Sequence, residues 1–224
     1  MKTILTSVIV TLSLVGVLFL NSCKKKEDVD PVKQNIQRLV PKNVIDTLRI
    51  LGMDIIDSGK PIQIAGIYEM NPMVLLASSN SADVVGGSYS PYRVRLFDQN
   101  DADQSIKADY KNGNETGNGL GGYVAGSGNK FSAFFEINGA AGSSTFKMSV
   151  VYTGEMSSTG IKNMQYAFYL KEKKDPGAII VKVGTTRVFK DSDGLSNIIS
   201  ALRLGIRDDE STNNSTILKS AVTQ

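Results

Sequence analysis

From residue 60 onward the chain is a succession of short apolar stretches separated by glycine, asparagine, serine and aspartate. Several stretches alternate apolar and polar residues, the pattern of a β-strand with one buried face. In the segment 130–137 the predicted core-facing residues are Phe131, Ala133, Phe135 and Ile137. Glu136 falls on the opposite face, where we expect solvent. Short strands at this spacing, joined by turn residues, are typical of an antiparallel barrel or sandwich.

Further turns, a glycine-rich stretch and additional strands are predicted from the same kinds of pattern. Asn138-Gly139, Ser158-Thr159-Gly160 and Asp175-Pro176-Gly177 are predicted hairpin turns. The stretch 112–129 contains seven glycines and is expected to be a loop or an irregular edge. Residues 195–207 fit a helix or a strand, and we favour a strand at 200–207. The remaining predicted strands are 62–68, 73–78, 92–98, 106–110, 145–156, 164–171, 178–183 and 186–190.

One helix is predicted at about 41–51, before the strands begin. Pro41 suits its first turn, and Gly52 suits the position just past its end. Val44, Leu48 and Leu51 share one face, so the helix should cover a sheet or, alternatively, bind a partner near the membrane. The prediction is therefore a mainly β protein. A single antiparallel β-barrel or β-sandwich domain spans 40–224, with one short N-terminal α-helix.

Composition excludes much of the familiar chemistry. The chain has no histidine and one cysteine, so it has no His-based triad, no internal disulfide and no cysteine metal cluster. The net charge of +3 is too small to indicate nucleic acid as a partner. Carboxylates could still hydrolyse glycosides. The candidates in or beside predicted strands are Glu69, Glu136, Glu155 and Glu172, and nothing in the sequence pairs any two of them. We expect no catalytic residue, cofactor or metal.

The N-terminus has the features of an export signal. Lys2 precedes a largely apolar run over 4–20, and a small residue follows before a cleavage point, as in a secretory signal peptide. Leu20, Ser22 and Cys23 resemble the lipobox of bacterial lipoproteins. That resemblance implies that residues 1–22 are removed and that Cys23 is acylated. Several acyl chains, such as palmitate, would make a lasting membrane anchor.

The residues after Cys23 are similar to the start of Bacteroidota-type lipoproteins. In that family a lysine followed by two acidic residues marks export to the cell surface, and Lys26, Glu27 and Asp28 fit this pattern. The resemblance implies an outer-membrane address, with the domain at the surface rather than in the periplasm. A generic solvated linker is the alternative. Residues 23–39 are then the acylated cysteine and a polar tether.

Two motif-like segments and one aromatic cluster are open to a functional interpretation. Residues 117–122 fit G-x-G-x-x-G, but no helix is predicted after them, so a dinucleotide site is not expected. Residues 191–194 partly fit a calcium loop, and a turn between strands explains them better. Tyr166, Phe168 and Tyr169 could stack on sugars or line a cavity, although core packing is the simpler interpretation for Tyr166 and Phe168.

We therefore expect a lipid-anchored cell-envelope protein of binding or structural type. The alternatives are a surface protein that binds or processes carbohydrate and a small-molecule carrier with a barrel cavity. Exposed tyrosines on a flat face would favour sugar, an apolar cavity would favour the carrier, and a filled core with neither would favour a structural role. The mature domain itself resembles no family that the sequence identifies.

Overall fold

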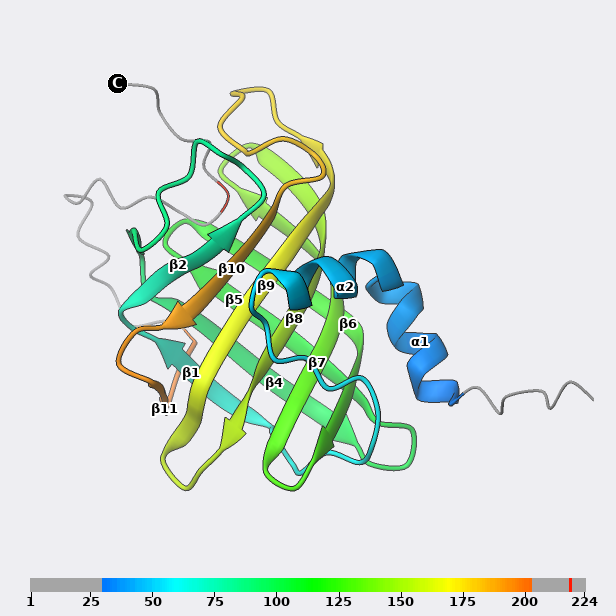
Figure 1. The fold of residues 1–224 in the computed structure, drawn as a ribbon. Helices are drawn as coiled ribbons and strands as arrows, with labels where there is room; N and C mark the ends of the chain where they lie inside the picture. The colour runs from blue at the N-terminus through cyan, green and yellow to red at the C-terminus, as the bar shows by residue number, and fades with distance from the viewer. Residues whose placement is uncertain (1–29, 203–217, 219–224) are drawn as a thin grey trace, which may run out of the picture.

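The computed structural model describes residues 30–202 and residue 218, and it confirms the mainly β prediction (Figure 1). In this part of the chain, eleven strands form one antiparallel sheet that is accompanied by two short helices. The helices are α1 (Pro31–Leu39) and α2 (Lys42–Ile50). The strands are β1 (Gly66–Met70), β2 (Met73–Ser78), β3 (Ser88–Tyr89), β4 (Tyr92–Asn100), β5 (Ser105–Asn112), β6 (Glu115–Ser127), β7 (Lys130–Ala141), β8 (Ser144–Met156), β9 (Gly160–Lys174), β10 (Thr186–Asp191) and β11 (Leu195–Ile198).

The sheet is a meander with an extension at one side. Strands β4 to β9 pair in chain order, and β1 pairs with β4. Beyond β9 the order continues β10, β2, β3. The short strand β11 pairs with both β1 and β9, through Tyr68↔Ile198 and Leu195↔Lys162. The long strand β9 therefore pairs with two short strands, because its residues 160–162 pair with β11 and its residues 165–169 pair with β10.

The main core lies on one face of this curved sheet, which we call the inner face. In Figure 1, β4 and β5 lie behind β8 and β9, and inner-face side chains pack between them. Tyr92 stacks on Tyr166 at 4.4 Å and on Tyr110 at 5.2 Å between ring centroids. The predicted inward set from strand β7 is confirmed, because all its members are buried in this core: Phe131, Ala133, Phe135 and Ile137.

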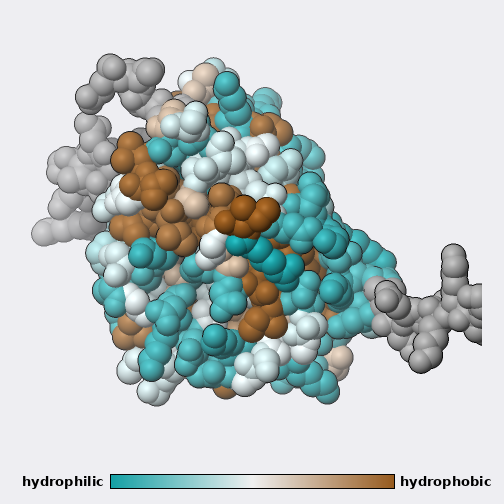
Figure 2. All heavy atoms as spheres, in the orientation of Figure 1, coloured by the Kyte–Doolittle hydropathy of each residue, from teal (hydrophilic) through white to brown (hydrophobic). Residues whose placement is uncertain are grey.

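Both helices lie on the opposite, outer face. Val44, Ile45 and Leu48 of α2 are buried there against outward residues of the sheet such as Phe134 and Val151. The prediction that a helix near 41–51 covers a sheet is confirmed. Figure 2 shows that hydrophilic residues cover most of the visible face, with hydrophobic residues gathered in a few patches.

The predicted tether and helix count need correction, because residues 31–39 form a second helix. Asp30 caps it by accepting a hydrogen bond from the Val32 N–H at 2.9 Å, and Pro31 starts its first turn. Ile36 of this helix is fully buried in the cluster between the helices and the sheet. The polar composition of this stretch suggested a tether, but a few apolar residues at helical spacing are enough to bind it to the sheet.

The glycine-rich stretch is not a loop. It contains β6, a central strand of the sheet. Here glycine makes room for aromatic rings of neighbouring strands: a Cβ on Gly117 would lie 2.4 Å from the Tyr110 ring, and one on Gly122 would lie 2.2 Å from the Phe135 ring. Such close approach is a known reason for glycine inside a strand.

Three smaller expectations also change. Asn138-Gly139 lies inside β7, and the turn of that hairpin is formed at Gly142 instead. Residues 178–183 belong to the connection between β9 and β10 rather than to a strand. The strand favoured at 200–207 is not observed in its described part, 200–202, and residues 203–207 lie outside the described part of the chain. The strand of this region is β11, at Leu195–Ile198.

Candidate functional site

The residues that the sequence marks for lipidation and export lie outside the described part of the chain. These are Leu20, Ser22, Cys23, Lys26, Glu27 and Asp28. Within residues 30–202 and 218, no helix has the length and apolarity needed to cross a membrane.

The two motif-like segments of the sequence lie in a strand and at a connection between two strands. Residues 117–122 are part of β6, with a bulge relative to both neighbouring strands. Asp191 ends β10, and residues 192–194 join it to β11. Here Ser196 Oγ donates to Asp191 at 2.7 Å and the Leu195 N–H donates to Asp193 at 2.9 Å. Burial raises the pKa of Asp191, and the negative charge of Asp193 adds to this effect. Among the described residues, no group of three or more metal-ligating side chains comes together.

Two of the four candidate carboxylates meet at one lysine. Lys147 Nζ lies 3.7 Å from Glu172 and 4.0 Å from Glu136. Glu136 also accepts a 2.6 Å hydrogen bond from Lys171. Glu69 and Glu155 are elsewhere, bound to Arg93 and Asn129 respectively. The pair of glutamates therefore belongs to a charged network on the outer face of β7, β8 and β9.

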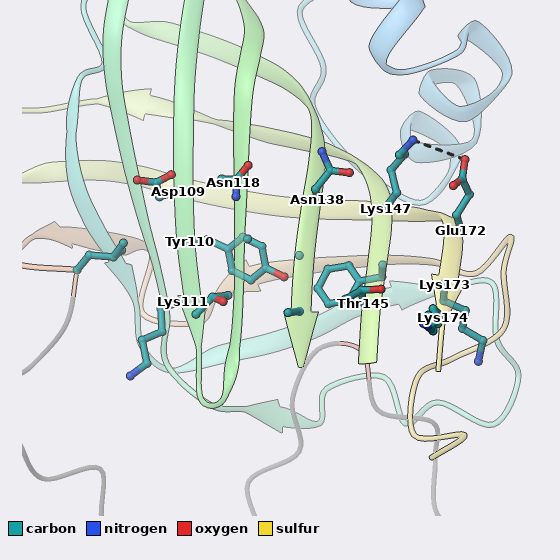
Figure 3. A pocket seen from close by; sticks show the side chains of 16 residues that line it. Asp109, Tyr110, Lys111, Asn118, Asn138, Thr145, Lys147, Glu172, Lys173 and Lys174 are labelled. Atoms are coloured by element: carbon teal, nitrogen blue, oxygen red, sulfur yellow. Dashed lines mark ion pairs between the residues drawn. The ribbon is translucent and has the colours of Figure 1, made fainter. Parts of the chain in front are cut away.

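This network borders a depression of about 700 Å³ formed by strands β5 to β9 (Figure 3). We call it the polar trough. Each strand contributes three consecutive residues, from 109–111, 116–118, 138–140, 145–147 and 172–174, and Leu202 adds an apolar contact.

Five polar side chains, one from each strand, cross the trough in a single row. The members of this polar row are Asp109, Asn118, Asn138, Lys147 and Glu172. Each is the direct cross-strand partner of the next, from β5 through to β9. The pleat sends these positions to the outer face, while their sequence neighbours Tyr110 and Phe146 point into the core.

The floor of the trough is made of small residues. A second row, two residues further along the strands, contains Thr116, Ala140 and Thr145 as cross-strand partners. Between the two rows lie Gly117 and Gly139, which also face each other. On the inner side of the sheet the Phe146 ring packs against Gly139. A Cβ atom at position 139 would lie only 2.4 Å from that ring, so a larger residue would not fit. Short side chains in the middle and long ones at both ends produce the hollow.

Charge in the polar row is concentrated at its ends. Asp109 is paired with Arg95 of β4, and Lys147 is paired with Glu172. The amides of Asn118 and Asn138 occupy the centre, are exposed, and make no side-chain hydrogen bond to any described residue. An amide supplies both donors and an acceptor, so two adjacent ones can bind a hydrophilic ligand without breaking an existing contact.

No aromatic side chain of the described residues is fully exposed, although four are half-buried: Tyr89, Phe97, Tyr123 and Tyr169. All eight tyrosines are buried or half-buried, including Tyr166, which the sequence assigned to core packing. Four of them meet in the core, where the Tyr92 and Tyr152 hydroxyls are 2.5 Å apart. Burial raises the pKa of both. The inner face therefore presents stacked rings, and on the outer face Tyr123 and Tyr169 are only partly accessible.

Comparison with known proteins identifies no relative. No family model matches the chain, and neither the curated proteins nor the solved structures contain a significant match.

Sequence reasoning missed the polar trough. The two Asn-Gly pairs at 118–119 and 138–139 were its strongest local signal, but such pairs more often mark hairpin turns. The polar row depends on how five strands are aligned with one another, and this alignment cannot be inferred from any single segment of the sequence.

Proposed function

We propose that this protein is a lipid-anchored, non-enzymatic binding protein of the bacterial outer membrane that displays its β domain at the cell surface. The polar trough carries this proposal. It is a sizeable depression whose central amides, Asn118 and Asn138, have no partner among the described residues. Cys23, which follows lipobox-like residues, would carry the lipid anchor.

We also propose that the sheet closes into a barrel rather than splitting into a sandwich. Support comes from β11, which pairs with β1 on one edge and β9 on the other. Contacts across the interior, such as the 4.4 Å stacking of Tyr92 on Tyr166, join opposite walls of one core. A closed sheet would also remove most exposed strand edges.

The packing of the core argues against the alternative of a small-molecule carrier. Carriers with a barrel fold need an interior cavity lined by apolar groups. Here the largest buried side chains, among them Tyr92, Tyr110 and Phe135, meet in the interior ring against ring. A filled core and the lack of exposed tyrosines meet the criterion for a structural role, and the polar trough on the outer face is the feature that favours binding instead.

The anchor is tested by Cys23→Ala. Because the thiol is the acceptor of the lipid, we expect palmitate incorporation to be lost completely and the precursor to keep its signal segment. Radiolabelled palmitate and the size of the protein on a gel measure both effects. Label that still enters the variant would contradict lipidation at Cys23.

Surface display is tested by replacing Glu27 and Asp28 with alanine. If Lys26-Glu27-Asp28 is the export signal, protease added to intact cells should digest the native domain and leave most of the variant protected. The matched control replaces Asp46, an exposed helix residue, and should remain sensitive. Equal digestion of the native chain and the Glu27/Asp28 variant would show that these residues are only a linker.

A further inference from the structure

We infer that the polar trough binds a neutral oligosaccharide, with the sugar chain lying across strands β5 to β9. This inference rests on the proposed binding function and names its ligand class. Its starting point is the polar row, in which neighbouring strands present one polar side chain each at the same register.

The mixture of donors and acceptors favours hydroxyl groups as the ligand chemistry. Asp109 and Glu172 accept hydrogen bonds, Lys147 donates, and the two central amides do both. A sugar hydroxyl also donates and accepts, so it can satisfy any member of the row. Thr116 and Thr145 extend the same capacity along the floor.

The spacing of the row suits an extended chain of rings. Neighbouring strands are about 4.8 Å apart, so the row spans roughly 19 Å from β5 to β9. An extended pyranose chain has a repeat close to the strand spacing, and one side chain would thus meet each sugar unit. The small floor residues leave room for the rings themselves, in a volume of about 700 Å³.

The charge distribution favours a neutral chain over a charged one. Most charged side chains that line the trough are already paired within the protein, Asp109 with Arg95 and Lys173 with Asp175, so they offer little free charge to an ionic ligand. Lys111 and Lys174 add one lysine at each end, so the lining has no excess of negative charge. Lys147 is already paired with Glu172 and Glu136, so its charge is largely compensated. Leu120, which is 68% exposed, follows Asn118 on the outward side of β6 and offers an apolar surface to the C–H face of a sugar.

The test is affinity electrophoresis of the full chain, purified in a neutral detergent. The gels contain a β-glucan, an α-glucan, a mannan, a xylan or polygalacturonate. We expect at least one of the neutral polysaccharides to slow the protein. The double variant Asn118→Ala/Asn138→Ala should weaken that binding about tenfold or more, since it removes two sets of hydrogen bonds. Ala140→Arg should weaken it as well by filling the floor.

The matched control is Asn197→Ala, which changes an exposed asparagine on β11, away from the row. It should bind like the native chain, and thermal unfolding verifies that all variants are folded. Three results would overturn the inference: no retardation by any neutral polysaccharide, retardation at least as strong by polygalacturonate, or an equal loss in Asn197→Ala. None depends on anchoring, so failure here is separate from failure of the Cys23 or export experiments.

Discussion

Asp83→Ala is expected to lower the free energy of unfolding by about 3–5 kcal/mol, because it leaves a buried guanidinium without its carboxylate. Asp83 lies in the loop after β2, and its two oxygens each accept a 2.6 Å hydrogen bond from Arg187 of β10. Both side chains are at most 2% exposed. Ser78 and Asn80 also donate to the same carboxylate, so one substitution breaks a whole network.

The size of this effect is large for a single domain. Total stabilities are about 5–15 kcal/mol, and the melting temperature of a chain this long should fall by roughly 6–20 °C. Thermal unfolding followed by circular dichroism measures it. The control is Asp46→Ala, which removes an exposed helix pair with Lys42 at 2.6 Å and should cost no more than about 1 kcal/mol. Equal effects of the two variants would mean that the buried pair is no stronger than a surface pair.

The same pair gives a pH dependence with a definite sign. Burial alone would raise the pKa of Asp83, but the hydrogen bonds from Arg187, Ser78 and Asn80 and the Arg187 charge lower it below its ordinary value of 3.8. A carboxyl whose pKa is lower in the folded state stabilises the fold above the unfolded pKa. That stabilisation is lost as the pH falls through the folded value. The stability difference between the native chain and Asp83→Ala should therefore shrink below about pH 4.

Phe135→Ala is expected to destabilise the domain by about 3–5 kcal/mol through loss of a buried ring. Phe135 is fully buried, and its ring meets that of Tyr152 edge-on at 5.8 Å. The ring also fills the space that glycine leaves at position 122 of β6. Alanine would therefore leave a cavity bordered by backbone, which cannot easily collapse to fill it.

Its neighbour Glu136 provides the control on the same strand. Glu136 points to the outer face, where it pairs with Lys171 and Lys147 at partly exposed positions. Glu136→Ala should change the free energy of unfolding by no more than about 1 kcal/mol. Urea denaturation of both variants measures the difference. If Glu136→Ala destabilised the chain as much as Phe135→Ala, the assigned faces of β7 would be wrong.

Local patterns in the sequence predicted the elements whose structure depends on few neighbours. Alternation over 130–137 identified the buried face of β7, and helical spacing of Val44 and Leu48 identified α2 and its packing side. Both follow from the geometry of one element, since a period of two or 3.6 residues places apolar groups on one side.

The sequence misled where a local preference was outweighed by distant contacts. Glycines in 112–129 predicted a loop because glycine favours turns, yet in β6 they admit rings from β5 and β7. Asn138-Gly139 predicted a turn for a similar reason, although this pair continues a long strand. Polar residues at 31–39 predicted a tether, but contact with the sheet supports a helix there.

The strand-rich class, the helix over the sheet, the inner face of β7 and the lack of histidine could all be inferred from local sequence patterns and composition. The pairing of β11 with two strands, the buried Asp83–Arg187 pair and the polar row follow only from the arrangement of the folded chain. The physical reason is register. Asn118 and Asn138 become neighbours only when β6 and β7 pair at one particular offset, and that offset is set by the packing of rings and glycines across the whole sheet.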